Sequence, residues 1–383
     1  MKLRSSHIAF LLLACICACG PKSTPGTLPP NACASIDLKT SATNCGKCNH
    51  ACLGGACVDG RCRPATLAAE PRGNVLSLAA DDESVVWFAT TGTESSIALE
   101  LARTGRPKTT LRRFPIGESG TLALDSKHAY VCRTADIVRV PLDGGALETF
   151  ASNGCQTIQV AAGRVFFDAN GSIFVKPVAG GAVRKLVAPE EDNPNIDGFH
   201  VMTDGAGIER LYFARGGAIH RRRTDAGPTE KVADAQFPQA AWTVASASVF
   251  LFEVYTSYGG KRIADPVPDA PGIENNCKSG PSVGGQCPNM NWALFEVPLA
   301  AGKRVERSPS ELWPHDAHAE GEHVYWAIGG VYSMNTSIRR MPLDAGPART
   351  IVGEPWSPGA WTVTPARVVW HDTEAHAIVS LAK

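Results

Sequence analysis

A unit of about 40 residues recurs along most of this chain, and no other feature limits the possible folds as strongly. The clearest copy, Thr121–Phe150, has the pattern of four short β-strands separated by turns. Its marker is a pair of apolar or aromatic residues in the second strand. The pairs are Val86-Trp87, Tyr130-Val131, Phe166-Phe167, Tyr212-Phe213, Phe250-Leu251, Tyr325-Trp326 and Val369-Trp370.

A small four-stranded sheet of this kind has two apolar faces and cannot bury both alone. Blades stacked face to face in a ring bury both. We therefore predict a seven-bladed, all-β propeller with four-stranded antiparallel blades over residues 64–383. The last unit reaches only its third strand at Lys383, so we expect Thr66-Leu67-Ala68-Ala69 to supply the missing strand and close the ring.

The units have the approximate form I-x-V-D, V-Y-W and I-x-R-V-P-L-D-G-G, and they resemble bacterial propellers of the YWTD, NHL and TolB-like kind. The resemblance covers about Thr66–Lys383 and implies the propeller fold. It implies no single activity, because this architecture carries binding proteins, lyases, hydrolases and quinoprotein dehydrogenases.

Charge excludes one class of partner. The chain has 37 basic and 37 acidic side chains and a formal net charge of zero. It has no global field that would attract nucleic acid or an anionic membrane surface. We therefore expect no nucleic-acid partner, and contact with a membrane only through an anchor.

The N-terminus has the pattern of an export signal over residues 1–18. Lys2 and Arg4 precede the apolar run Ile8–Ala18, which is shorter than the roughly 20 residues of a spanning helix. The sequence Ile16-Cys17-Ala18-Cys19 resembles a bacterial lipoprotein lipobox. The resemblance implies cleavage before Cys19 and lipidation of Cys19.

Two alternatives to this signal remain open. Leu12-Leu13-Ala14-Cys15 also fits a lipobox and would lipidate Cys15, and an ordinary secretory signal cut nearby would leave no lipid. Gly20 follows Cys19, and the absence of Asp at this position implies an outer-membrane lipoprotein in a two-membrane cell envelope. Residues 19–32 are rich in Pro, Ser, Thr and Gly and predict a flexible tether.

Residues 33–63 predict a small disulfide module. Its cysteines resemble those of a Cys-rich module of myxobacterial surface proteins, which implies a spacer or adhesion element. An exported chain is oxidised, so we expect three disulfides. A zinc knuckle of Cys45, Cys48, His50 and Cys52 is the alternative. The six cysteines are Cys33, Cys45, Cys48, Cys52, Cys57 and Cys62.

Two further cysteine pairs lie in the repeats. Cys132 ends a second strand and Cys155 precedes the next blade, so both are expected on the same face of neighbouring blades, as a disulfide requires. Cys277 and Cys287 lie in a long insertion, Tyr255–Trp292, between the second and third strands of blade five. We predict a disulfide that staples this loop on the same face.

Asp316 and His318, in the first strand of blade six, are the residue pair best suited to chemistry. First strands line the channel of a propeller, and residues two apart in a strand point the same way. The pair is a weak candidate for a metal site or for moving a proton. A solvated, hydrogen-bonded pair is the alternative, because no second histidine or carboxylate is expected from another first strand.

Two weaker candidates lie on the same face. His371-Asp372, at the end of a second strand, is interpreted as a solvated loop or as part of a rim site. The acidic residues Glu190-Glu191-Asp192 and Asp197 offer oxygen ligands for calcium but lack a recognised spacing. We therefore predict no confident catalytic residue, no metal and no cofactor.

The sequence favours an exported, lipid-anchored envelope protein that binds a protein or glycan on the loop face of a propeller. An envelope lyase or hydrolase centred on Asp316 and His318 is the alternative function, and a purely structural spacer is another.

Overall fold

The computed structural model describes residues 35–69, 74–90, 96–118, 120–204, 207–235, 241–245, 247–258, 261–262, 289–300, 303–311, 314–329, 336–344, 346–354 and 358–383. Within these ranges every regular element is a β-strand, and none is a helix that could cross a membrane. The signal, the tether and Cys33, Cys277 and Cys287 lie outside the described residues.

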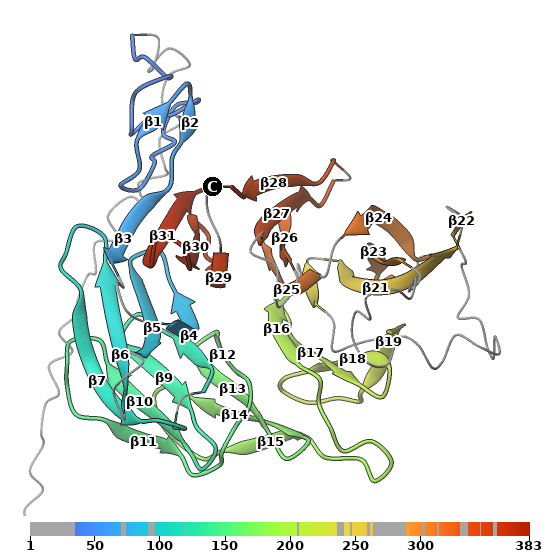
Figure 1. Ribbon diagram of the computed structural model, residues 1–383. Coiled ribbons are helices and arrows are strands. Elements are labelled where there is room, and N and C mark those ends of the chain that lie inside the picture. Colours follow the sequence, from blue (N-terminus) through green and yellow to red (C-terminus); the bar gives the residue numbers. More distant parts are fainter. Residues whose placement is uncertain are drawn as a thin grey trace, which may run out of the picture.

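Seven antiparallel sheets form the ring that the repeats predict (Figure 1). The first three blades run from the innermost to the outermost strand in chain order. Blade one is β4 (Asn74–Ala80), β5 (Ser84–Thr90), β6 (Ser96–Arg103) and β7 (Thr109–Pro115); blade two is β8 (Leu122–Leu124), β9 (His128–Cys132), β10 (Ile137–Pro141) and β11 (Glu148–Ala151); blade three is β12 (Ile158–Ala161), β13 (Arg164–Ala169), β14 (Ser172–Pro177) and β15 (Arg184–Val187).

The other four blades follow the same order. Blade four is β16 (Phe199–Thr203), β17 (Glu209–Arg215), β18 (Ala218–Arg223) and β19 (Glu230–Asp234); blade five is β20 (Trp242–Ala245), β21 (Ser248–Tyr258), β23 (Asn289–Pro298) and β24 (Val305–Glu311), with β22 (Lys261–Arg262) beside β21; blade six is β25 (Pro314–Glu320), β26 (His323–Ile328), β27 (Ser337–Pro342) and β28 (Arg349–Val352); blade seven is β29 (Pro358–Val363), β30 (Arg367–Asp372), β31 (Ala377–Ala382) and β3 (Ala65–Ala69).

The N-terminal strand β3 closes the ring, as the sequence predicts. Ala65 lies opposite Ser380, and Ala69 lies opposite Ala377 in an antiparallel ladder with one irregularity. This pairing uses the open edge of β31 and joins the two ends of the propeller. Ala68 is buried and packs into the interface between blades seven and one.

A separate apolar cluster fills each of the seven interfaces between blades. The marker pairs form these clusters because successive strand residues point to opposite faces of a sheet. In blade two, Tyr130 packs toward blade three, and Val131 packs toward blade one. Each large side chain buried in this way contributes about 1.5–3 kcal/mol. The repeat therefore fixes the ring because the two members of a marker pair lie in the two interfaces on either side of their blade.

The sequence interpretation took the first strands to line the channel, with one of their two alternating rows of side chains pointing into it. The structure differs from this expectation. Both rows face neighbouring blades. Leu122 packs toward blade one, and Ala123, the next residue, packs toward blade three. In the same way Trp242 packs toward blade four. A first strand in a propeller has a blade on each side, so its alternation separates two interfaces.

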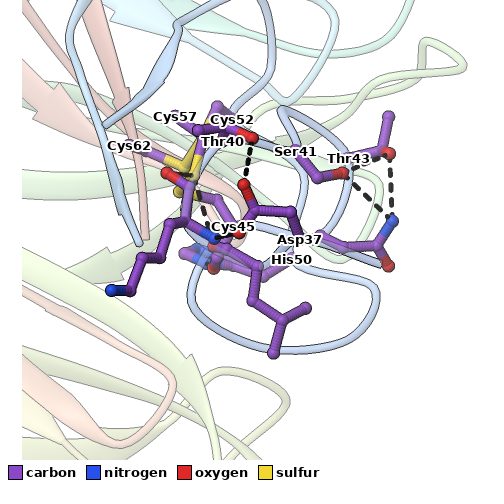
Figure 2. The surroundings of a disulfide bond; sticks show 12 residues. Asp37, Thr40, Ser41, Thr43, Cys45, His50, Cys52, Cys57 and Cys62 are labelled. Atoms are coloured by element: carbon purple, nitrogen blue, oxygen red, sulfur yellow. Dashed lines mark hydrogen bonds between the residues drawn. A yellow bond between two sulfur atoms is a disulfide. The ribbon is translucent and has the colours of Figure 1, made fainter. Parts of the chain in front are cut away.

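The cysteine-rich module ends in a small hairpin, β1 (Cys57–Val58) and β2 (Arg61–Cys62), that leads directly into β3 (Figure 1). Cys45 is bonded to Cys57, and Cys52 to Cys62 (Figure 2). Cys48 is disulfide-bonded as well. Since zinc binds thiolates, these disulfides leave no cysteine of the proposed knuckle available as a zinc ligand.

The blade-five insertion begins later than the sequence suggests. Strands β21 and β23 stay paired from Ser248 and Pro298 out to Ser257 and Asn289, so both ends of Tyr255–Trp292 are strand. The inner strand β20 accompanies β21 only as far as Leu251. A long two-stranded arm therefore extends from blade five.

Candidate functional site

The loop face of the propeller carries the turns between second and third strands and the connections between blades. Cys132, at the end of β9, forms a disulfide with Cys155 in the connection to blade three, with Cα atoms 5.4 Å apart. The arm of blade five leaves the ring at the equivalent position, between β21 and β23. In an antiparallel blade all these segments emerge at the same end of the sheet.

Asp316 and His318 lie at the loop-face end of the first strand of blade six. His315 lies opposite Ala327 and Ala317 opposite Trp326, so Asp316 is the extra residue of a β-bulge. Its φ angle is 49°, in the left-handed region, and its side chain is exposed. The bulge interrupts the strand alternation at Asp316, so the rule that residues two apart in a strand point the same way does not apply to this pair.

His318 instead packs against the next blade. Its imidazole lies edge-to-face on the Trp361 ring of β29, with ring centres 4.7 Å apart, and the side chain is partly buried. Burial lowers the pKa of His318, and the negative charge of Asp316 raises it in part. The imidazole is therefore held neutral near pH 7 and keeps a lone pair.

The sequence interpretation missed His200, which lies on the first strand of blade four. His200 pairs with Tyr212 in the strand register, just as His318 pairs with Tyr325, so the two histidines occupy equivalent positions. The expectation that no second histidine comes from a first strand is therefore wrong. The signal was present, because Tyr212 belongs to a marker pair and fixes the register of its neighbour.

His200 also packs against the next blade. Its Nε2 atom donates to the carbonyl oxygen of Trp242 over 3.0 Å, and its ring lies edge-to-face on that indole. Burial and, to a smaller extent, the charge of His318 lower the pKa of His200, the hydrogen bond to Trp242 raises it in part, and the resulting pKa is about 4. Gln159 has the same position in blade three and bonds both the N–H and the carbonyl of Val201 in blade four.

The second candidate, His371-Asp372, is buried and not a solvated loop. His371 is 3% exposed and Asp372 is 1% exposed. Asp372 Oδ1 accepts the backbone N–H groups of Glu374 and Ala375 and so fixes the turn after β30. His371 Nε2 and Asp372 Oδ2 are buried without a hydrogen-bond partner. Burial lowers the pKa of His371, so this histidine stays neutral inside the blade interface.

The acidic loop before blade four has a structural use. Arg215, 2% exposed, donates through Nη1 to Glu190 Oε1 over 2.9 Å and through Nη2 to the carbonyl oxygens of Gly171 and Ala188. Glu190 is thus the counter-ion of a buried guanidinium. Among the described residues, the one group of potential metal ligands is Cys45, Cys52 and Cys62, whose sulfurs are in disulfides.

The entry to the first strand is irregular in three consecutive blades. Bulges interrupt the pairing of first and second strands in blades six, seven and one, whereas blades two to five pair without interruption. In blade one the bulged residue, Leu76, is 49% exposed. Bulges redirect side chains at strand ends and gather near binding sites. The loop face is therefore asymmetric, with Asp316 and Leu76 exposed on the bulged side.

Comparison with known proteins supports the fold and indicates no function. No family model matches the chain, and no curated protein matches it. Hydrazine synthase of Kuenenia stuttgartiensis is similar at a TM-score of 0.52 and 11% identity, over 83% of this chain and 98% of that chain. The β-propeller domain of the trilobed protease of Pyrococcus furiosus is similar at a TM-score of 0.52 and 8% identity, over 81% of this chain and 95% of that one.

The second of these propellers is described as having an open velcro topology. The present chain instead closes its ring through β3 and β31. At such low identity the likeness establishes architecture alone. The strand pairing shows that this chain is a closed, seven-bladed β-propeller with a disulfide-rich N-terminal module, and the comparisons support the propeller architecture.

Proposed function

We propose that this chain is an exported, lipid-anchored cell-envelope protein that binds a protein partner on the loop face of its propeller. The observation that carries the proposal is the arm of blade five. Among the described residues, β21 has no register partner in β20 beyond Leu251 until it pairs with β22 at Ser257 and Tyr258. In the same described part of the chain, β23 has no register partner in β24 beyond Trp292, outward along the arm. The arm thus presents backbone edges beyond the four-stranded sheet.

Unpaired strand edges favour a protein partner over a glycan. A row of free N–H and C=O groups pairs with an extended peptide and adds it to the sheet. The rigid ring behind the arm limits the entropy lost on binding. The Cys132–Cys155 disulfide stabilises a neighbouring part of the same face.

A trimmed arm tests the binding proposal. Tyr255 and Asn291 lie opposite each other, so an Asn-Gly turn between them would replace residues 256–290 and preserve the remaining register. We expect the trimmed protein to fold and to lose the partner that co-purifies with the parent after cross-linking in native envelopes. Asp143→Lys, in an exposed turn of the opposite face, is the control and should keep that partner.

If the trimmed protein retains every partner, the arm is not the binding element. Binding that persists after protease treatment of the extract and disappears after glycosidase treatment would favour a glycan instead.

The lipid anchor rests on the residues around Cys19 and has its own test. Labelling with a fatty-acid analogue should mark the parent protein and the Cys15→Ala variant, and should fail in Cys19→Ala. Labelling of Cys19→Ala that is lost in Cys15→Ala would move the anchor to Cys15. Outer-membrane location is proposed on the same basis, and fractionation of the two membranes checks it.

An envelope lyase or hydrolase remains a second candidate because of one observation. Asp316 holds a positive φ angle at an exposed bulge, and such strained non-glycine residues gather at functional sites. His318, held neutral beside it, is suited to accept a proton. A stoichiometric metal in the purified protein that is lost in His318→Ala would support this candidate, and a metal-free protein would favour the binding function.

A further inference from the structure

Within the described residues, one hydrogen bond recurs at the end of the third strand in six of the seven blades. The residue after the strand donates its N–H to the turn before the second strand of the same blade. The bonds are Leu142 to Lys127, Val178 to Gly163, Thr224 to Glu209, Leu299 to Ala247, Leu343 to Glu322 and Lys383 to Ala366. Lys383 of blade seven is therefore the structural equivalent of Leu142 of blade two.

The carbonyl oxygen of this residue usually accepts an arginine from the preceding blade. Guanidinium groups suit the role because they reach across an interface and donate several hydrogen bonds. The contacts are Arg103 to Leu142 at 3.3 Å, Arg139 to Val178 at 3.0 Å, Arg184 to Thr224 at 2.5 Å and Arg307 to Leu343 at 2.9 Å. Neighbouring blades are thus joined by a repeated cation-to-carbonyl bond.

In blade seven a histidine of the cysteine-rich module takes this position. His50 Nε2 lies 2.7 Å from the backbone oxygen of Lys383. In a chain that ends at Lys383 this oxygen belongs to the α-carboxylate, which is ionised above about pH 4. His50 Nδ1 lies 2.6 Å from the carbonyl oxygen of Cys45, within the disulfide-bonded core of the module (Figure 2). The imidazole therefore bridges the cysteine-rich module and Lys383, the residue that follows β31.

These two contacts determine the charge of the bridge. Neither a carbonyl oxygen nor an ionised carboxylate oxygen has a proton to donate, so each contact is a hydrogen bond only if the histidine nitrogen carries hydrogen. Neutral imidazole has one N–H, and imidazolium has two. Both bonds therefore form only when His50 is protonated, in keeping with the arginines at the equivalent carbonyls.

We propose that the His50 imidazolium is a proton-dependent clasp that fixes the cysteine-rich module to the closing seam of the propeller. The seam is the pairing of β3 with β31. β3 follows the module directly, and Lys383 follows β31. Loss of the proton removes one of the two bonds, so the module loosens at the edge where the ring closes.

The charged groups around the clasp come from several elements. Lys383 interacts with Glu320 of β25, Arg340 of β27, Asp82 of the β4–β5 turn and His323 of β26, while Lys47 lies on the turn of His50 itself. Carboxylate, lysine and arginine side chains ordinarily titrate outside pH 5–8, and histidine titrates within it. His50 and His323 are therefore the two side chains in this set to distinguish.

The test uses the whole protein without a C-terminal tag. Nitrogen NMR of labelled histidine should show both ring nitrogens of His50 protonated at pH 5.5. Hydrogen exchange at the amides of Cys45 and Lys383, corrected for intrinsic rates, should speed up by about tenfold between pH 5.5 and pH 8, as expected for loss of one charged hydrogen bond.

Three variants test whether His50 causes the pH dependence of hydrogen exchange. His50→Arg should protect these amides equally at both pH values, because arginine stays charged. His50→Ala should leave them unprotected at both, with unchanged circular dichroism. His323→Gln should keep the pH dependence of the parent. A His50 ring with one bare nitrogen at pH 5.5, or parent and His50→Arg proteins that respond alike to pH, would overturn the proposal.

Discussion

His200 donates a hydrogen bond from Nε2 to the carbonyl oxygen of Trp242, 3.0 Å away, and its ring lies edge-to-face on the same tryptophan with centres 4.6 Å apart. The two residues belong to neighbouring blades and to first strands, at the wall of the ring. The contact satisfies the polar Nε2–H of a partly buried histidine, and burial keeps the ring neutral.

Acid should weaken the fold through His200. Its pKa is about 4 when folded, against about 6.5 in an unfolded chain, so the unfolded state takes up the proton first as pH falls. Stability is therefore fully present above about pH 6.5 and is lost down to about pH 4. The shift corresponds to a loss of up to about 3 kcal/mol, which denaturant unfolding at several pH values measures.

Replacement of His200 by glutamine should reduce this acid sensitivity, because Gln159 already fills the equivalent position in blade three. His376→Asn, at an exposed position, should retain the acid sensitivity of the parent. An undiminished loss of stability in His200→Gln would assign the effect to other groups.

Removal of the Cys132–Cys155 disulfide should destabilise the propeller. The bond joins residues 23 apart in sequence. A disulfide that closes a loop of that size stabilises the folded state by about 3 kcal/mol, because it restricts the unfolded chain. The Cys132→Ala, Cys155→Ala double variant should lose about that much in denaturant unfolding. An equally stable double variant would mean that the unfolded chain gains little freedom here.

A charge placed on β3 should destabilise the fold only at a position whose side chain is buried between blades seven and one. Ala68 is buried between blades seven and one, whereas Thr66 on the same strand is exposed. Ala68→Asp buries an unpaired carboxylate, and we expect it to cost several kcal/mol or to prevent folding. Thr66→Asp should change stability by less than about 0.5 kcal/mol. Similar losses in both variants, measured by thermal unfolding, would contradict the role of Ala68.

Arg367 should be a main support of the interface between blades seven and one. It is fully buried and donates from Nη2 to the carbonyl of Asp81 and from Nη1 to Thr104 Oγ1, which joins blade seven to blade one. Burial lowers its pKa. Arg367→Met should cost about 1–3 kcal/mol, because it removes two part-buried hydrogen bonds from a charged donor that join the two blades. Arg223→Met, on the exposed side of blade four, is the control and should be nearly neutral in denaturant unfolding.

The sequence by itself determined the ring. Marker pairs such as Tyr130-Val131 recur about every 40 residues except across the blade-five insertion, and strand alternation assigns each member to one of two blade interfaces. The number of blades and the closing strand Thr66–Ala69 follow from this regularity, because an incomplete last unit leaves one open edge. The disulfide character of residues 33–63 also follows from local spacing.

Only the tertiary structure decided the site. A bulge changes the direction of Asp316, and bulges depend on how two strands settle against each other rather than on a pattern in either one. His200 and His318 are far apart in sequence and become equivalent only through strand register. His50 meets Lys383 across 333 positions, since the ring brings its ends together, and no local pattern contains that contact.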